Sequence, residues 1–239
     1  MFLTLRRRNS KAYKHIFIDL DRTIWDFEQN KTDALHDIFF DHQLDLIFPN
    51  FDAFMKSYTK NNDYLWIKYR KNELPKEILR FKRFEMTLSD YGEANLKLAK
   101  TLGEEYLQVM PLKTATIPGS RELLEYLHPN YSLYVLSNGF SEVQTPKLKR
   151  CHLDNFFDRV ITSEALGYHK PDKRAFGQAL SIVNARKEDS IMIGDELDVD
   201  ILGARKFGID QIYFNPFKIK HRERVTHEVT QLLQIKDIL

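Results

Sequence analysis

The sequence is poor in cysteine and in long apolar runs. Cys151 is the single cysteine among 239 residues, so neither an internal disulfide nor a cysteine-rich zinc site can form. No apolar run approaches the roughly 18 residues that a membrane-spanning helix requires. The first residues carry their basic side chains after a short apolar start, which is the reverse of a secretory signal. We therefore expect a soluble, cytoplasmic protein in which residues 1–12 form a basic tail.

The sequence also lacks a large excess of positive or negative charge. The chain has 36 Lys and Arg against 34 Asp and Glu, a formal net charge of +2. This balance by itself gives no case for a nucleic acid polymer as a partner, so electrostatic function has to be local. Since no apolar run is long enough to span a bilayer, we expect no membrane partner either. The motifs HExxH, GxxxxGK[ST] and GxSxG are absent, which argues against the zinc hydrolases, P-loop enzymes and serine hydrolases that carry them.

What the chain does contain is a series of short apolar segments separated by amphipathic ones. Segments rich in Ile, Val, Tyr and Phe lie at residues 15–19, 131–137, 157–162, 190–194 and 210–214. Segments of this kind are typical of strands buried on both faces of a parallel sheet. Helical patterns lie between them, for example at 120–127 and 171–183. The alternation predicts an α/β fold, a Rossmann-like doubly wound parallel sheet.

Residues 26–110 interrupt this alternation. The segment is rich in aromatic and basic residues, has no glycine before Gly92 and shows no convincing strand pattern. We predict that it is a helical domain inserted into a core made of residues 13–25 and 111–239, with hinges near 25–26 and 111–118.

Polar side chains follow the predicted strands where each strand ends. Because the carboxyl ends of parallel strands line one crevice, we expect these groups to converge there. Several carboxylates together favour a hard divalent cation, most plausibly Mg²⁺, while hydroxyl, amide and ammonium groups suit phosphate oxygens. The pattern therefore predicts a phosphoryl-transfer site. Its members are Asp19 and Asp21 after the first strand, Ser137 and Asn138 after the second, Lys170 after the third, and Asp195 and Asp200 after the fourth.

These residues resemble, in order, the four motifs of the haloacid dehalogenase superfamily. The motifs are DxDxT (Asp19, Asp21, Thr23), Ser137-Asn138, Lys170 before a proline, and GDxxxxD (Gly194, Asp195, Asp200). The insertion resembles the helical cap of the type I members. The opening segment "FIDLDRTIWDFEQN" looks most like the pyrimidine 5′-nucleotidase branch.

The resemblance implies a role for each matched residue. Asp19 would be the nucleophile that forms an aspartyl-phosphate, and Asp21 the general acid and base. Mg²⁺ would be held by the side chains of Asp19 and Asp195 and the backbone carbonyl of Asp21. The other matched residues would bind phosphate (Ser137, Asn138, Lys170) or support the site (Asp200, Thr23).

The implied function is a Mg²⁺-dependent phosphomonoesterase that acts on a small phosphorylated metabolite, such as a pyrimidine nucleoside 5′-monophosphate. Sugar phosphates remain alternatives, as do a phosphomutase and a signalling protein that accepts phosphate without turnover. A dehalogenase is disfavoured, because dehalogenases of this superfamily lack an acid two residues after the nucleophile, where this chain has Asp21.

Structural interpretations compete with several of these assignments. Asp195, Asp198 and Asp200 could stabilise the start of the helix that ends near Gly208, and we prefer that role for Asp198. Arg22, at a position where many relatives have a small residue, either braces the loop or points to solvent. Most basic residues of the insertion are expected on solvated helix faces, and a minority could attract an anionic substrate. These residues are Lys68, Arg70, Lys71, Lys76, Arg80, Lys82 and Arg83.

Overall fold

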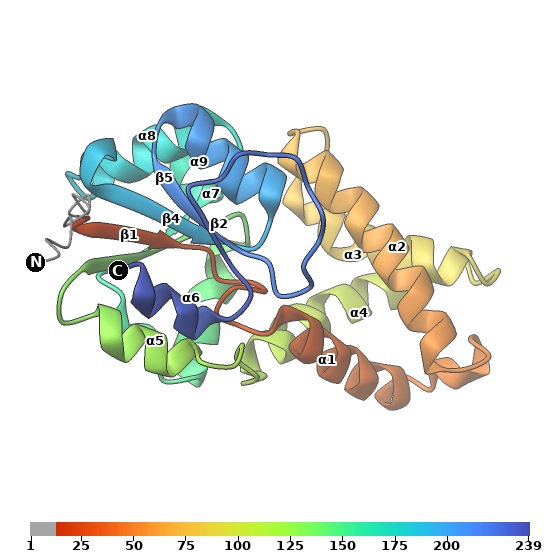
Figure 1. The fold of residues 1–239 in the computed structure, drawn as a ribbon. Coiled ribbons are helices and arrows are strands. Elements are labelled where there is room, and N and C mark those ends of the chain that lie inside the picture. Colours follow the sequence, from red (N-terminus) through yellow and green to blue (C-terminus); the bar gives the residue numbers. More distant parts are fainter. Residues whose placement is uncertain (1–12) are drawn as a thin grey trace, which may run out of the picture.

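The computed structural model describes residues 13–239, so the basic tail predicted for residues 1–12 lies outside the described part of the chain. Its centre is a six-stranded sheet of order β3-β2-β1-β4-β5-β6 in which every neighbouring pair is parallel (Figure 1). This confirms the predicted α/β class. The strands are β1 His15–Ile18, β2 Ser132–Ser137, β3 Arg159–Thr162, β4 Ser190–Gly194, β5 Asp210–Phe214 and β6 His227–Val229.

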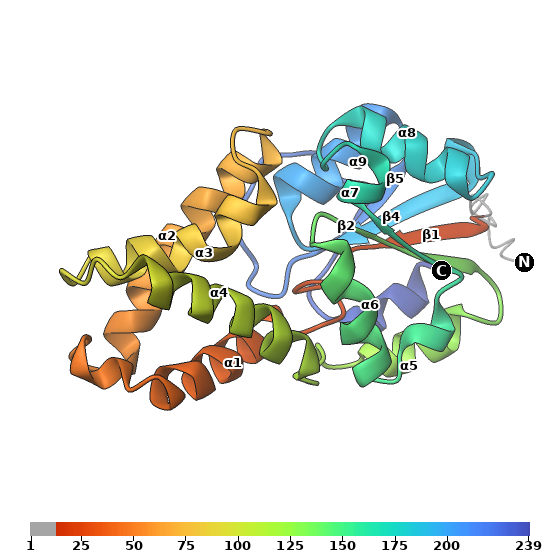
Figure 2. The ribbon, with the colours of Figure 1, turned by 180° about the vertical axis from the view of Figure 1, so that it is seen from behind.

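The central strand β1 is buried on both faces. Ile16 and Ile18 pack into one apolar cluster, and Phe17, which points the other way, packs into a second. The first cluster includes side chains of α5 (Ser120–Leu127) and α6 (Ser141–Arg150), and the second includes those of α8 (Lys173–Ile182) and α9 (Leu202–Phe207). Helices therefore cover both faces of the sheet, as Figures 1 and 2 show. The short α7 (Ser163–Leu166) lies beside α8.

Four further helices lie beyond the carboxyl ends of the strands (Figure 2). They are α1 Phe27–Asp41, α2 Phe51–Arg70, α3 Lys76–Ser89 and α4 Leu96–Val109. Asparagine side chains cap the N-termini of two of these helices. Asn50 accepts a hydrogen bond from the amide of Ala53, and Asn95 accepts one from the amide of Leu98. Several short helices connect the longer elements: Leu44–Leu46, Met110–Leu112, Asp154–Phe156, Lys187–Asp189, Leu197–Ile201 and Leu232–Asp237.

The two chain segments that join these four helices to the sheet lie side by side. Trp25 forms a bridge with Thr116, and the amide of Asp26 donates to the carbonyl of Ala115. The buried Asn30 side chain both donates to and accepts from the backbone of Ala115, at 2.8 and 2.9 Å. Among residues 13–239, every helix is too short or too polar to cross a lipid bilayer.

Candidate active site

The chain turns sharply as soon as β1 ends. The amide of Asp19 still donates to Ile193 of β4, which places this carboxylate at the carboxyl end of the sheet. The amides of Ile24 and Trp25 then both donate to the carbonyl of Leu20, so the backbone folds back on itself. Arg22, inside this turn, has a φ of 69°, a conformation that costs an arginine more than a glycine. Its guanidinium pairs with Glu28, so Arg22 braces the turn against α1.

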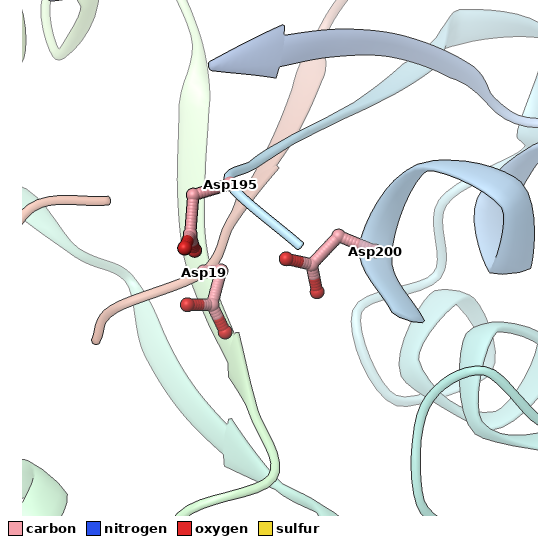
Figure 3. Close-up of side chains that lie close together, drawn as sticks. All are labelled: Asp19, Asp195 and Asp200. Carbon is pink, nitrogen blue, oxygen red and sulfur yellow. The ribbon is translucent and has the colours of Figure 1, made fainter. Parts of the chain in front are cut away.

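Asp19 meets two other carboxylates from the neighbouring strand end. Asp195 directly follows β4, and Asp200 lies in the short helix Leu197–Ile201. One carboxylate oxygen from each of the three lies within 4.8 Å of the others, and Figure 3 shows the three side chains converging. Asp198 is exposed in the first turn of the same short helix and is not a member of this cluster.

Lys170 lies beneath the cluster and is almost fully buried. Its Nζ is 2.6 Å from Asp19 Oδ1, 2.7 Å from Asp200 Oδ1 and 2.5 Å from the carbonyl oxygen of Leu136. An ammonium group has three N–H donors, and two of them form hydrogen bonds, to Asp19 Oδ1 and to the Leu136 carbonyl, while Asp200 is an ion-pair partner only. The phosphate-binding role predicted for Lys170 requires a substrate oxygen to share the ammonium group with these oxygens.

The acidic cluster carries more negative charge than Lys170 can balance. Burial raises the pKa of Asp19 to about 7, although the nearby Lys170 acts in the opposite direction. Burial, together with the charges of Asp19 and Asp200, raises the pKa of Asp195 well above its ordinary value. Burial alone would lower the pKa of Lys170, but Asp19 and Asp200 raise it. Desolvated carboxylates that repel each other are relieved by a cation, so these oxygen donors fit a hard divalent ion such as Mg²⁺.

Asp21 points away from this cluster, toward α6. Lys147 Nζ lies 2.6 Å from its Oδ1, and Gln144 Nε2 donates to its Oδ2 at 2.9 Å. Gln144 Nε2 also donates to Ser137 Oγ at 2.8 Å, and the amide of Gly139 donates to the same hydroxyl. Lys147 and Gln144 are both buried, and neither was among the residues that the motifs indicated. Gln144 connects Asp21 with Ser137, and Lys147 holds the other oxygen of Asp21.

Asn138 and Thr23 hold other members of the site. Asn138 both donates to the carbonyl of Lys170 and accepts from its amide, each at 2.9 Å. Both ends of the side-chain amide are thus engaged with the backbone of Lys170, which supports a positioning role, and phosphate binding by Asn138 stays a prediction. Thr23 Oγ1 donates to Asp195 Oδ1 at 3.1 Å, so it orients this carboxylate.

A cavity of about 370 Å³ opens above these groups. Its floor includes Asp19, Asp21, Ser137, Asn138 and Asp195 at the strand ends. Its walls come from α2, α3 and α4 and from the loop that leads into α6. The wall residues include aromatic and aliphatic side chains (Phe27, Trp66, Tyr106, Leu107, Met110, Phe140, Val143) and polar ones (Asn62, Asp63, Arg70, Arg83, Glu196).

Several basic residues of the helical insertion are engaged rather than simply solvated. Arg70 Nη1 lies 2.8 Å from Glu196, directly after Asp195, and Lys76 Nζ lies 2.6 Å from Glu164. Arg80 pairs with Glu142 at the start of α6. Arg83 is only 3% exposed, so its predicted place on a solvated face is wrong. These ion pairs connect α2 and α3 to elements that border the sheet.

Comparisons with known proteins agree with this geometry. A family model described as haloacid dehalogenase-like hydrolase matches residues 13–208. The pyrimidine 5′-nucleotidase PynA of Streptococcus pneumoniae is 29% identical over 231 residues, which cover 95% of each chain. The pyrimidine 5′-nucleotidase YjjG of Escherichia coli is 29% identical over 91% of this chain and 96% of its own. The solved structure of the HAD-hydrolase YfnB from Bacillus subtilis bound to magnesium has a TM-score of 0.85 at 26% identity, over 95% of this chain and 99% of its own.

Proposed function

Because this chain belongs to the haloacid dehalogenase-like hydrolase family and is a phosphatase, we propose that it hydrolyses nucleoside 5′-monophosphates, with a preference for pyrimidine nucleotides. The observation that carries the proposal is that Asp19 and Asp21 line one cavity whose walls combine aromatic and aliphatic side chains with polar ones. Such a cavity suits a flat, weakly polar ring joined to a phosphate. Two relatives that align over nearly the whole chain are named pyrimidine 5′-nucleotidases.

We propose that Asp19 is the nucleophile. Lys170 holds Oδ1 of Asp19 and so fixes the orientation of the carboxylate at the floor of the cavity. An oxygen of Asp19 attacks phosphorus, the bond from phosphorus to the ester oxygen breaks, and an aspartyl-phosphate forms. Water then attacks the phosphorus, which releases phosphate and restores the carboxylate of Asp19.

Asp21 would transfer the protons for both steps. In the first step its carboxyl group gives a proton to the departing ester oxygen, and in the second its carboxylate takes one from the attacking water. Lys147 and Gln144 each hold one oxygen of Asp21, so the side chain is fixed at the edge of the cavity. Ser137, linked to Asp21 through Gln144, would donate to a phosphate oxygen.

The acidic cluster would bind Mg²⁺ through the carboxylates of Asp19 and Asp195, with the backbone carbonyl of Asp21 as a third donor and Asp200 in support. A bound Mg²⁺ neutralises negative charge on the phosphate and on Asp19. The donors are oxygens of partly or fully buried carboxylates, which is the ligand chemistry that Mg²⁺ prefers.

We also propose that residues 26–110 form a cap domain on a core made of residues 13–25 and 111–239. The paired connecting segments and the ion pairs of α2 and α3 with Glu196, Glu142 and Glu164 support this division. The walls of the cavity would then come from the cap and its floor from the core, which makes the cap the main source of substrate specificity. The cytoplasmic location predicted from the sequence stays a prediction.

The test is phosphate release from UMP, CMP, AMP, GMP and ribose 5-phosphate, measured with Mg²⁺ and again with EDTA. We expect the highest kcat/KM with UMP and CMP and no release in EDTA. Conversion of a sugar phosphate into its isomer without free phosphate would favour a phosphomutase. A stable phosphorylated protein that releases no phosphate from any substrate would favour the signalling alternative. Release that is fast with ribose 5-phosphate and slow with every nucleotide would contradict the proposed substrate.

A further inference from the structure

Four cationic side chains line the cavity, and one of them differs from the rest. Arg22 pairs with Glu28, Arg70 with Glu196, and Lys147 with Asp21. Arg83, on α3, lines the same cavity and is 3% exposed, yet it forms no ion pair with any of the described residues. A buried guanidinium without a counter-charge is costly, so its environment calls for an acceptor.

The hydrogen bonds of Arg83 leave most of its donors unused. Nε donates to the carbonyl of Arg80 at 3.2 Å, and Nη1 donates to Asn62 Oδ1 at 3.3 Å. Nη2 is buried and has no hydrogen-bond partner among the described residues. Since a guanidinium carries five N–H donors, three have no partner among the described residues, on a side chain that lines the cavity. Unsatisfied buried donors cost free energy unless a ligand satisfies them.

The surroundings of Arg83 indicate what kind of acceptor fits. The guanidinium carbon lies 4.7 Å from the centre of the Tyr106 ring, and Tyr106 also lines the cavity. Asp63, next to Asn62, adds a negative charge to the same wall. An additional phosphate or carboxylate on the substrate would be repelled by Asp63 and poorly solvated by the aromatic wall. A neutral flat ring with a carbonyl oxygen avoids both costs.

We infer that Arg83 is a specificity-determining residue that donates hydrogen bonds to a ring carbonyl of the substrate base. This inference rests on the proposed function and identifies the chemistry by which the cavity would prefer bases with a ring carbonyl, the pyrimidines among them, over adenine. Uracil, thymine and cytosine share a carbonyl at C2 and guanine has one at C6, whereas adenine has none. Arg83 touches neither Asp19 nor Asp21 in the described contacts, so it contributes to the recognition of the base and not to the chemistry at phosphorus.

The test compares three substrates in wild type, Arg83→Met and Arg83→Lys. Methionine keeps the length of the side chain and removes every donor, and lysine keeps the charge. Because a hydrogen bond to a charged group contributes about 1.5–3 kcal/mol, we expect Arg83→Met to lower kcat/KM for UMP about tenfold to hundredfold. The values for AMP and ribose 5-phosphate should stay within about twofold. Arg83→Lys should recover part of the loss with UMP. The matched control is Lys82→Met, on the same helix but outside the cavity lining.

Two results would overturn the inference. Equal losses with all three substrates would make Arg83 a structural residue, held by its contact with Tyr106. An unchanged kcat/KM for UMP would show that the base does not meet Arg83. Hydrolysis of p-nitrophenyl phosphate, which has no base, distinguishes failure of the proposed phosphatase function from failure of the inference about Arg83. If wild type hydrolyses neither this compound nor UMP, calorimetric binding of uridine decides the inference: loss of binding in Arg83→Met would support it, and equal or absent binding in both proteins would overturn it.

Discussion

Replacement of Lys147 by methionine tests how Asp21 is held. Lys147 is 2% exposed, its Nζ lies 2.6 Å from Asp21 Oδ1, and the same ammonium lies 4.3 Å from the centre of the Trp25 ring. Methionine can keep the apolar contact with Trp25, but it cannot hold the carboxylate. Gln144 would then be the only described partner of Asp21, and the side chain could rotate away from the leaving oxygen.

The expected decrease in kcat follows from the loss of the contact between Lys147 and Asp21. A charge-assisted hydrogen bond contributes about 1.5–3 kcal/mol, so Lys147→Met should lower kcat for UMP by about tenfold to hundredfold. Breaking a fully buried ion pair costs about 3–5 kcal/mol of stability. Because the Asp21 side chain is 20% exposed and can regain water, we expect a smaller decrease in the free energy of unfolding, about 1–3 kcal/mol.

The assay is a double-mutant cycle on kcat with Lys147→Met, Asp21→Asn and the double variant. If Lys147 acts only through Asp21, adding Lys147→Met to Asp21→Asn should change kcat by less than about twofold. Lys149→Met, on the exposed face of the same helix, controls for loss of charge in α6. Two independent losses that multiply in the double variant would refute the positioning role. So would a full wild-type kcat in Lys147→Met accompanied by lower thermal stability.

Three other changes probe the remaining parts of the site. Asp19→Asn should lower phosphate release by about 10⁴-fold or more while the circular dichroism spectrum stays that of the folded protein, and a rate near wild type would exclude Asp19 as the nucleophile. Mg²⁺ at about 100 times its Kd should raise the free energy of unfolding by about 2.7 kcal/mol and Tm by about 5–10 °C. Asp195→Asn should abolish this shift, whereas equal Tm values in Mg²⁺ and EDTA for wild type would contradict the metal site. Gly139→Ala should lower kcat about tenfold, because a Cβ there would overlap Gln144 Nε2 and displace the group that holds Asp21. Gln144→Ala makes room for that Cβ, so Gly139→Ala should cost much less in that background, and an equal cost would show that Gly139 acts in another way.

The sheet could be predicted because its strands are buried on both faces and therefore appear as short apolar runs. Five strands were predicted within a few residues of their observed ends. The exception is β6, which pairs with β5, is only three residues long and carries two polar residues, His227 and Glu228. A strand this short at the edge of a sheet leaves no hydrophobic pattern, so it is visible only through its pairing.

Side chains that hold the site were harder to predict than the motif residues they contact. Asp19 and Asp195 lie directly after strands, where topology alone brings them together. Gln144 and Lys147 lie on α6, and their contact with Asp21 depends on how that helix packs against the turn after β1. The sequence does carry a signal, since Gln144 and Lys147 share the buried face of α6 with Val143 and Leu148. Polar residues on the apolar face of a helix indicate partners that are also buried.

Arg83 is also a polar residue on the buried face of its helix. Leu79, Arg83 and Thr87 follow one another at intervals of four on the buried face of α3, so helical periodicity placed the arginine inside although its charge favoured solvent. A buried charge without a counter-charge contributes little or nothing to stability, and an apolar residue of similar size is often as stable or more so. If Arg83 serves substrate recognition, Arg83→Met should therefore keep or raise Tm while it lowers kcat/KM for UMP. A decrease in both would mean that the contacts of Arg83 with Tyr106 and Asn62 stabilise the fold.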